Sequence, residues 1–463
     1  MPSKFAIFTY GCQMNEHDSE RLAGLLVADG MEPTQDLDDA DLVVFNTCCI
    51  RENADNRLYG QLGRLKELAD EKPGLTIAVG GCLAQKDREL VRQRAPHVDV
   101  VFGTHNLARA PELLRRSALE GPITEVLDAP DPDSPPMHLT PPPLRELPYA
   151  AWITIQTGCD NSCAFCIVPS VRGGEASRPP GDIVAEVEAL AGRGVIEVTL
   201  LGQNVNSYGR DITRRSPLFA ELLRSIGAVE GIDRIRFTSP HPKDLRPETM
   251  AAMAETPAVC EQLHLPLQSG SDRVLSAMRR GYTAERYLER LGAVRAAVPD
   301  LAVTTDIIVG FPGETDDDFA ATLDVVAEAR YDSAYTFIFS PRQGTRAAEM
   351  GDDFVADEVI AERFERLRVV VERSALARHQ ERIGRIERVL IEGPSRKDPS
   401  VLAGRTRQGK IAHFVAPPGV PTPAMGSLAD VAITGAAPHH LRAELVQVTA
   451  GPKHRSRIPV SIR

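Results

Sequence analysis

Three cysteines stand close together before the middle of the chain. Cys159, Cys163 and Cys166 lie in the segment GCDNSCAFCIVP, separated by three and then two residues. Three thiolates on one short loop can bind three irons of a [4Fe–4S] cluster and leave the fourth iron open to another ligand. A structural zinc site would need a fourth nearby Cys or His, and none follows before His241. The spacing therefore favours a cluster with one open iron over a zinc site.

A second set of cysteines is spread over the first hundred residues. Cys12, Cys48 and Cys82 each come just after a short apolar segment typical of a strand. Since the carboxyl ends of parallel strands share one edge of a sheet, we expect these thiols to converge and to bind a second [4Fe–4S] cluster. The alternative is three buried structural cysteines, because free cysteine is commonly buried. Cys49 is expected to point away from this set, and Cys260 to belong to the core.

The fold class expected from the chain is α/β, in three parts. Strand-like and helix-like segments alternate over residues 1–125, which predicts a parallel sheet with crossover helices. Residues 126–148 are rich in proline and indicate a linker. The alternation resumes over 149–376 and predicts a complete or partial (β/α) barrel. Residues 378–449 are β-rich, which predicts a small antiparallel β-barrel of OB-like type, followed by a basic tail over 450–463.

The composition favours a cytoplasmic protein with a polyanionic partner. No apolar run reaches the ~18 residues that a membrane helix needs, and the N-terminus lacks the pattern of a signal peptide. The cytoplasm also keeps thiols reduced and available for metal. The net charge is −11, yet residues 381–463 hold 13 Lys and Arg against 6 Asp and Glu. This asymmetry indicates a basic appendage that attracts nucleic acid, with a merely solvated tail as the alternative.

Beyond these patterns, the chain resembles the radical S-adenosylmethionine (SAM) methylthiotransferases over nearly its whole length. The N-terminal motifs are GCQMNEHDSE, VVFNTCCIRENA and AVGGCLAQ, and the central ones are GCDNSCAFCIVPSVRGGEASRP, LLGQNVNSYG, LHLPLQSGSDRVLSAMRRGYT and DIIVGFPGET. The tail from about residue 378 resembles a TRAM domain, the RNA-binding β-barrel of this family. Gln13, Met14 and Asn15, in GCQMN, favour the MiaB branch.

The resemblance implies an activity and its cofactors. MiaB-type enzymes attach a methylthio group to carbon 2 of N6-isopentenyladenosine at position 37 of tRNA. The alternatives are relatives that act on threonylcarbamoyl-adenosine in tRNA or on a ribosomal protein. The resemblance implies that SAM binds the open iron of the Cys159, Cys163 and Cys166 cluster and yields a 5′-deoxyadenosyl radical. The second cluster, on the set that begins with Cys12, would hold a sulfur atom.

The resemblance also implies further site residues and partners. Phe165, before the third cysteine, fits the cofactor-binding pattern of the family. Gln203, Asn204, Gln268 and Ser269 follow expected strands on the side where SAM would lie. The expected partners are the tRNA anticodon arm, an electron donor such as flavodoxin or ferredoxin and a sulfur donor, with no membrane and with the protein as a monomer. Contacts to RNA are expected from Arg396, Lys397, Arg405, Arg407 and Lys410. The segment RRGYT over 279–283 is either a further RNA contact or a solvated helix end.

Overall fold

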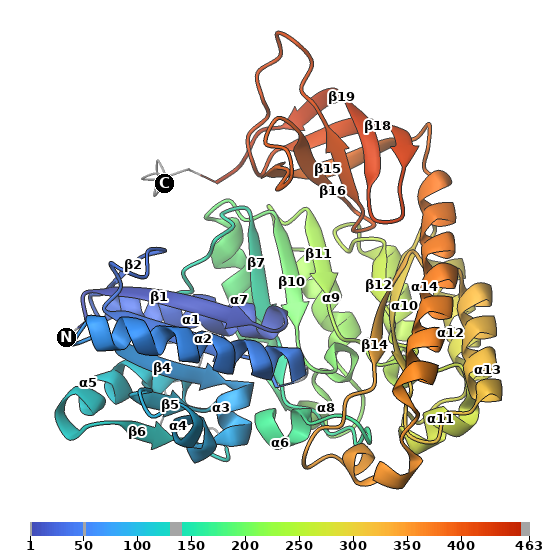
Figure 1. Ribbon diagram of the computed structural model, residues 1–463. Coiled ribbons are helices and arrows are strands. Elements are labelled where there is room, and N and C mark those ends of the chain that lie inside the picture. Colours follow the sequence, from blue (N-terminus) through green and yellow to red (C-terminus); the bar gives the residue numbers. More distant parts are fainter. Residues whose placement is uncertain (1, 50–51, 130–140, 455–463) are drawn as a thin grey trace.

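The computed structural model describes residues 2–49, 52–129 and 141–454. The expected linker over 126–148 is therefore described only at its ends, and the expected tail over 450–463 only as far as residue 454; the rest of both lies outside the described residues. Figure 1 shows three parts: an α/β layer structure, a central strand-and-helix core and a small β-barrel that stands on the core. No helix among the described residues is long and apolar enough to cross a membrane.

The N-terminal part is a six-stranded parallel sheet with the strand order β2-β1-β3-β4-β5-β6. Apolar side chains of α1 and α5 pack on one face of the sheet and those of α2, α3 and α4 on the other. The strand β3 is buried at every position, as expected for a parallel strand between two helix layers. The strands are β1 (Lys4–Tyr10), β2 (Glu32–Pro33), β3 (Leu42–Thr47), β4 (Thr76–Gly81), β5 (Val100–Phe102) and β6 (Ile123–Glu125). The helices are α1 (Gln13–Ala28), α2 (Glu52–Glu71), α3 (Cys82–Asp87), α4 (Glu89–Arg94) and α5 (Ala110–Glu120).

The central part is a partial (β/α) barrel, as predicted. Two three-stranded parallel sheets, β11-β10-β7 and β12-β13-β14, are joined by a parallel bridge between Ile235 and Val259. Its strands are β7 (Ala150–Thr154), β10 (Glu197–Leu201), β11 (Arg234–Phe237), β12 (Gln262–His264), β13 (Ala302–Val309) and β14 (Ser333–Ile338). The main helices around them are α7 (Pro180–Ala191), α9 (Phe219–Gly227), α10 (Pro247–Glu255), α11 (Asp272–Ala277), α12 (Ala284–Ala297), α13 (Asp316–Ala329) and α14 (Asp357–Gln380). β7 and β14 are the two outer edges, so the barrel is open between them.

The C-terminal part is a closed five-stranded barrel with the order β15-β16-β17-β19-β18. The prediction of a small β-barrel is confirmed, but its purely antiparallel character was wrong, because β17 and β19 pair in parallel. The reason is topological: strands that alternate in direction around a closed ring must be even in number, so five strands require at least one parallel pair. The strands are β15 (Ile386–Pro394), β16 (Leu402–Thr406), β17 (Ile411–Phe414), β18 (Leu428–Ala436) and β19 (Leu441–Ala450).

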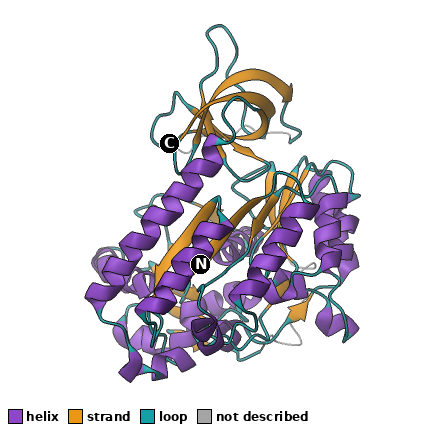
Figure 2. Cartoon of the chain, turned by 90° about the vertical axis from the view of Figure 1, so that its right-hand side faces the viewer, coloured by secondary structure: helices purple, strands orange, loops and turns teal. Residues whose placement is uncertain are grey.

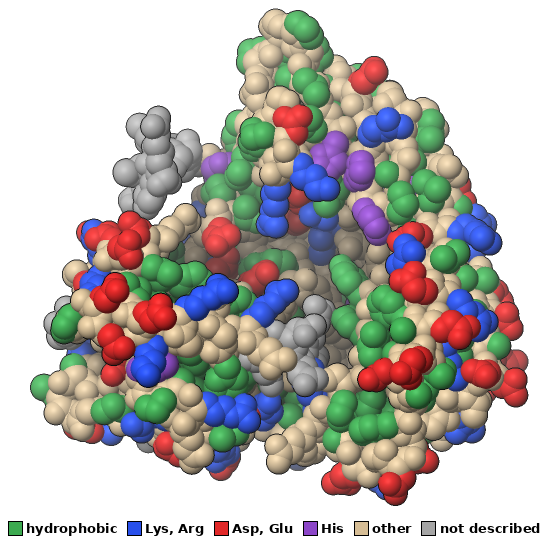
Figure 3. Space-filling model, viewed as in Figure 1, with side chains coloured by type: hydrophobic (Ala, Val, Ile, Leu, Met, Phe, Trp, Pro, Cys, Tyr) green, Lys and Arg blue, Asp and Glu red, His purple; other side chains and the backbone are tan. Residues whose placement is uncertain are grey.

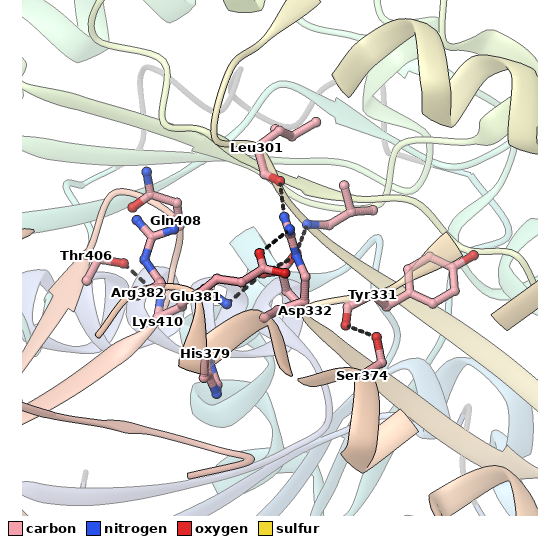
Figure 4. A network of polar contacts seen from close by, with 12 residues as sticks. Leu301, Tyr331, Asp332, Ser374, His379, Glu381, Arg382, Thr406, Gln408 and Lys410 are labelled. Atoms are coloured by element: carbon pink, nitrogen blue, oxygen red, sulfur yellow. Dashed lines mark hydrogen bonds and ion pairs between the residues drawn. The ribbon is translucent and has the colours of Figure 1, made fainter. Parts of the chain in front are cut away.

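The β-barrel rests on the amino ends of the core strands, opposite to the end where α6 (Val168–Arg172) lies (Figure 1). The long helix α14 leads from the core to the barrel (Figure 2). Beside it, Lys410 Nζ lies 2.6 Å from Asp332 Oδ1, and both side chains are buried (Figure 4). Removing one partner of such a pair would leave a buried charge uncompensated, so the pair fixes the barrel in place.

Three of the five barrel cations that were predicted to contact RNA form ion pairs within the protein. Each cation is already paired with a carboxylate, so its charge is balanced without a phosphate. Short pairings of this kind are what a buried or half-buried cation requires. The pairs are Arg405 with Glu392 (2.5 Å), Arg407 with Glu261 (2.8 Å) and Lys410 with Asp332 (2.6 Å).

Candidate active site

The three strands that precede Cys12, Cys48 and Cys82 lie side by side. β1, β3 and β4 are neighbours in the sheet, and their last residues, Tyr10, Thr47 and Gly81, are paired in register. The cysteines follow within two positions and therefore leave the same edge of the sheet. The predicted convergence of the three thiols is confirmed, whereas their role as cluster ligands stays a prediction.

Cys49 lies against this set, although it was expected to point away from it. Cys48 donates a hydrogen bond to Cys12, and Cys49 donates one to Cys82. The expectation was wrong because β3 ends at Thr47, so the alternation that sends neighbouring side chains to opposite faces no longer applies. Cys49 is fully buried within the apolar cluster of the sheet, which distinguishes it from Cys12 at the edge.

These contacts lower the pKa of two of the thiols. The hydrogen bond from Cys48 lowers the pKa of Cys12 to about 6, with help from the positive charge of Arg172. The hydrogen bond from Cys49 and the same arginine lower the pKa of Cys82 to about 7, against the effect of burial. The thiolate is the form that binds metal, so both groups are suited to iron near neutral pH.

The arginine comes from the central part of the chain. Arg172, at the end of α6, places Nε 3.3 Å from Cys82 Sγ and Nη2 2.7 Å from Asp18 Oδ2. Its side chain is only 8% exposed. Sequence reasoning missed this residue because nothing in the local pattern marks a contact between positions 90 residues apart.

Cys159, Cys163 and Cys166 lie on the loop between β8 (Gln156–Thr157) and α6. The amide of Cys166 donates a hydrogen bond to the carbonyl of Cys163, and the amide of Cys159 donates one to the carbonyl of Gly173. The donor–acceptor distance is 3.1 Å in both. The loop thus begins near the carboxyl end of the first core strand, where barrels of this kind place their sites. Burial raises the pKa of Cys159 and that of Cys166, the latter to about 12, so iron must displace protons from them.

A second buried arginine, which follows α11, contacts this loop. Arg280 Nη1 is 3.2 Å from Cys163 Sγ, and its Nε donates to the hydroxyl of Tyr282. Arg280 belongs to the RRGYT segment that was predicted to contact RNA, and its burial excludes that role for this side chain. Each cysteine set therefore has one buried guanidinium on one sulfur.

The two cysteine sets suit clusters better than single metal ions. Among the described residues, no three His, Cys, Asp or Glu side chains could hold one metal ion together. The ligands of a cube-shaped cluster need not converge on one atom, because each thiolate binds a separate iron. No disulfide links the eight cysteines, which leaves the thiols available. The donor chemistry and grouping of the six predicted ligands fit two [4Fe–4S] clusters.

Three side chains with buried amide oxygens lie near the loop that carries Cys159, Cys163 and Cys166. One precedes this loop in the sequence, and two follow the neighbouring strand of the sheet. Gln203 and Asn204 follow β10, and Gln156 lies two residues before Gly158. The side-chain oxygens of all three are buried without a hydrogen-bond partner among the described residues. An unsatisfied buried acceptor costs about 1–3 kcal/mol, so these atoms are suited to donors of a bound ligand such as SAM. Gln156 was missed because it lies within a strand rather than after one.

The remaining predicted cofactor residues have different surroundings. Phe165 packs against an apolar cluster that contains Met278 and Phe311. Gln268 has a left-handed φ of 72°, a strained conformation that is often found at functional sites. The hydroxyl of Ser269 lies 3.3 Å from that of Thr322, so it is used within the protein. The structure therefore supports Gln203 and Asn204 more directly than Ser269.

The three parts of the molecule surround a hollow (Figure 3). Lys and Arg side chains and histidines gather at its upper edge, below the β-barrel. The barrel itself carries a basic cluster of residues around His440, whose pKa is lowered first by burial and then by these neighbours. These groups are His413, Arg442, His439 and Lys397. Lys397 and Arg442 are exposed and available to a polyanion.

Three family descriptions match the three parts of the chain. Residues 4–103 match Uncharacterized protein family UPF0004, residues 153–326 the Radical SAM superfamily and residues 380–446 the TRAM domain. Among solved structures, the radical SAM methyltransferase TsrM from Kitasatospora setae, solved with cobalamin and a [4Fe–4S] cluster, has a TM-score of 0.53 at 16% identity. The match covers 75% of this chain and 77% of that one, and it bears on the fold alone. The fold and the cysteine loop thus define a radical SAM protein with an additional N-terminal α/β part and a TRAM barrel.

Relatives in two bacteria narrow the assignment. The chain is 53% identical over 452 residues to the tRNA-2-methylthio-N(6)-dimethylallyladenosine synthase of Acidothermus cellulolyticus, covering 96% of this chain and 88% of the relative. It is 51% identical over 452 residues to the protein of the same name in Mycolicibacterium smegmatis, covering 95% and 86%. The chain belongs to this family, the MiaB-type methylthiotransferases.

Proposed function

We propose that this protein adds a methylthio group to carbon 2 of N6-isopentenyladenosine (dimethylallyladenosine) at position 37 of tRNA. The observation that carries the proposal is the presence of two separate cysteine sets, one on the sheet edge and one on the core loop, in a chain that also ends in a TRAM barrel. An acid–base pair would not suffice for this reaction, because the C–H bond at carbon 2 has no acidic proton.

The roles of the residues follow from their positions. When bound, the two clusters and SAM would supply the radical chemistry and the methylated sulfur, which the protein has to hold and shield. Cys159, Cys163 and Cys166 would hold the cluster that binds SAM, and the set that begins with Cys12 would hold the other. Gln203 and Asn204 offer buried acceptors to the cofactor.

The basic cluster on the barrel is suited to the tRNA anticodon arm. Contacts of Lys397 and Arg442 to phosphates would position the arm without reading its sequence. The target base would then reach the hollow below the barrel, which opens beside the core (Figure 3). A reductant such as flavodoxin or ferredoxin and a sulfur donor complete the proposed set of partners, in the cytoplasm where tRNA is found.

The proposal is tested by mass analysis of tRNA nucleosides from a strain that lacks the gene. We expect 2-methylthio-N6-isopentenyladenosine to disappear, N6-isopentenyladenosine to accumulate, and the wild-type chain to restore the modified form. Unchanged methylthiolated nucleoside would contradict the proposal. Loss of a methylthiolated threonylcarbamoyl-adenosine, or of a methylthio group on a ribosomal protein, would instead identify one of the two alternatives.

A variant of the basic cluster should bind tRNA more weakly without losing its chemistry. Replacing Lys397 and Arg442 together with alanine removes two exposed cations, so we expect the salt slope of tRNA binding to fall by about 2. The KM for tRNA should rise while kcat changes little. The control is Arg388→Ala on the same barrel, whose guanidinium is already paired with Asp430. Equal salt slopes for the double variant and the wild type would contradict this role.

A further inference from the structure

The short helix α6 connects the two cysteine sets physically. It begins two residues after Cys166 and runs into the N-terminal part, where Ile167 and Val171 are buried in the apolar cluster of the sheet. The hydroxyl of Thr104 donates to the carbonyl of Val171 over 2.6 Å. Arg172, which ends this helix, is therefore held against the first sheet, although the helix directly follows the loop that carries the second cysteine set.

The surroundings of Arg172 favour an anionic group at the sheet edge. A buried guanidinium is costly unless opposite charge and hydrogen-bond acceptors surround it. One carboxylate, that of Asp18, accepts from Nη2 at 2.7 Å. A second acceptor is the sulfur of Cys82, 3.3 Å from Nε. This contact lets the guanidinium donate directly to a sulfur that the proposed function assigns to the N-terminal cluster.

We propose that Arg172 is a positioning residue that raises the reduction potential of the cluster on Cys12, Cys48 and Cys82. Cluster potentials depend on net charge and on hydrogen bonds to the sulfurs, and Arg172 supplies both a positive charge and a donor. Because Arg172 ends the helix that follows Cys166, it also fixes the N-terminal cluster relative to the SAM-binding loop. The inference rests on the proposed function, since it requires a cluster at the sheet edge.

Arg280 provides a reciprocal case within the same molecule. It contacts Cys163 of the core loop and comes from the core itself, so its effect should be confined to the SAM-binding cluster. Arg172 instead contacts Cys82 and should affect the N-terminal cluster. Matched variants of the two arginines therefore separate a specific effect on one cluster from a general loss of stability.

The experiment uses the full chain with Cys159, Cys163 and Cys166 replaced by alanine, so that only the N-terminal cluster gives a signal. After anaerobic reconstitution, the midpoint potential is measured by redox titration followed by electron paramagnetic resonance. We expect Arg172→Gln to shift the potential to a more negative value, Arg172→Lys to shift it less, and Arg280→Gln to leave it unchanged. Equal potentials for the parent and Arg172→Gln would overturn the inference.

Iron content makes the other outcomes decisive. If Arg172→Gln loses the cluster while Arg172→Lys keeps about four irons per chain, the potential of Arg172→Lys decides: a more negative value than that of the parent supports the inference, and an equal value overturns it. If both variants lose it alike, the charge is not the cause, and the inference fails. If the parent itself binds no iron at Cys12, Cys48 and Cys82, the proposed function fails instead, which distinguishes the two.

Discussion

Replacing Cys48 with alanine should abolish methylthiolation of tRNA, whereas replacing Cys49 should only reduce it. Cys48 contacts Cys12 at the sheet edge, while Cys49 contacts Cys82 and is not one of the three predicted ligands. Second-shell changes at metal sites already cost about 10–100-fold, so loss of a ligand should cost at least the upper end of this range. The Cys49→Ala variant keeps all three predicted ligands but loses the hydrogen bond to Cys82, so its activity should fall by about 10–100-fold without being abolished. Nucleoside mass analysis of the reaction products measures both.

Formation of 5′-deoxyadenosine distinguishes the roles of the two cysteine sets. The Cys48→Ala variant keeps the loop with Cys159, Cys163 and Cys166, so it should still form 5′-deoxyadenosine from SAM after reduction. Its iron content should fall from about eight to about four per chain. Full methylthiolation by Cys48→Ala, with loss of activity in Cys49→Ala, would show that the ligand is Cys49. The hydrogen bond between Cys49 and Cys82 makes this comparison necessary.

The sequence predicts the parts of the site that depend on local pattern. The strands before Cys12, Cys48 and Cys82 are short apolar runs followed directly by cysteine, and the topology of parallel sheets brings their ends to one edge. The core loop is a single contiguous motif. Both features involve residues whose positions are set by the element immediately before them, so the expected grouping of each cysteine set agrees with the structure.

Features that depend on packing between distant segments could not be predicted. The contact of Arg172 with Cys82 joins two parts of the chain, and the burial of Lys410 depends on where the barrel docks on the core. A count of basic residues cannot distinguish Lys410, paired with Asp332, from the exposed Lys397. The parallel pair in the barrel likewise follows from ring closure with an odd number of strands, which requires the strand count to be known.

Replacing Gly158 with alanine should eliminate the SAM-binding cluster without removing any cysteine. Gly158 has a φ of 75°, and a Cβ on it would lie 1.9 Å from the carbonyl oxygen of Gly174 and 2.6 Å from that of Gly173. Both obstacles are backbone atoms, so no side-chain rotation relieves the clash. The left-handed conformation adds roughly 1–2 kcal/mol for a residue with a Cβ. The loop must therefore shift, and it carries the neighbouring Cys159 with it.

The expected result is about four irons per chain instead of about eight, with neither 5′-deoxyadenosine nor methylthiolated nucleoside formed. Gly181→Ala is the matched control, because this exposed glycine lies in the first turn of α7 with no atom within 4 Å of the added methyl group. Alanine favours a helix over glycine, so this variant should keep its iron and its activity. Full iron content and normal 5′-deoxyadenosine formation by Gly158→Ala would mean that Cys159 tolerates a displaced loop. The close packing of residues 158 and 173–174 would then have no part in holding the cluster.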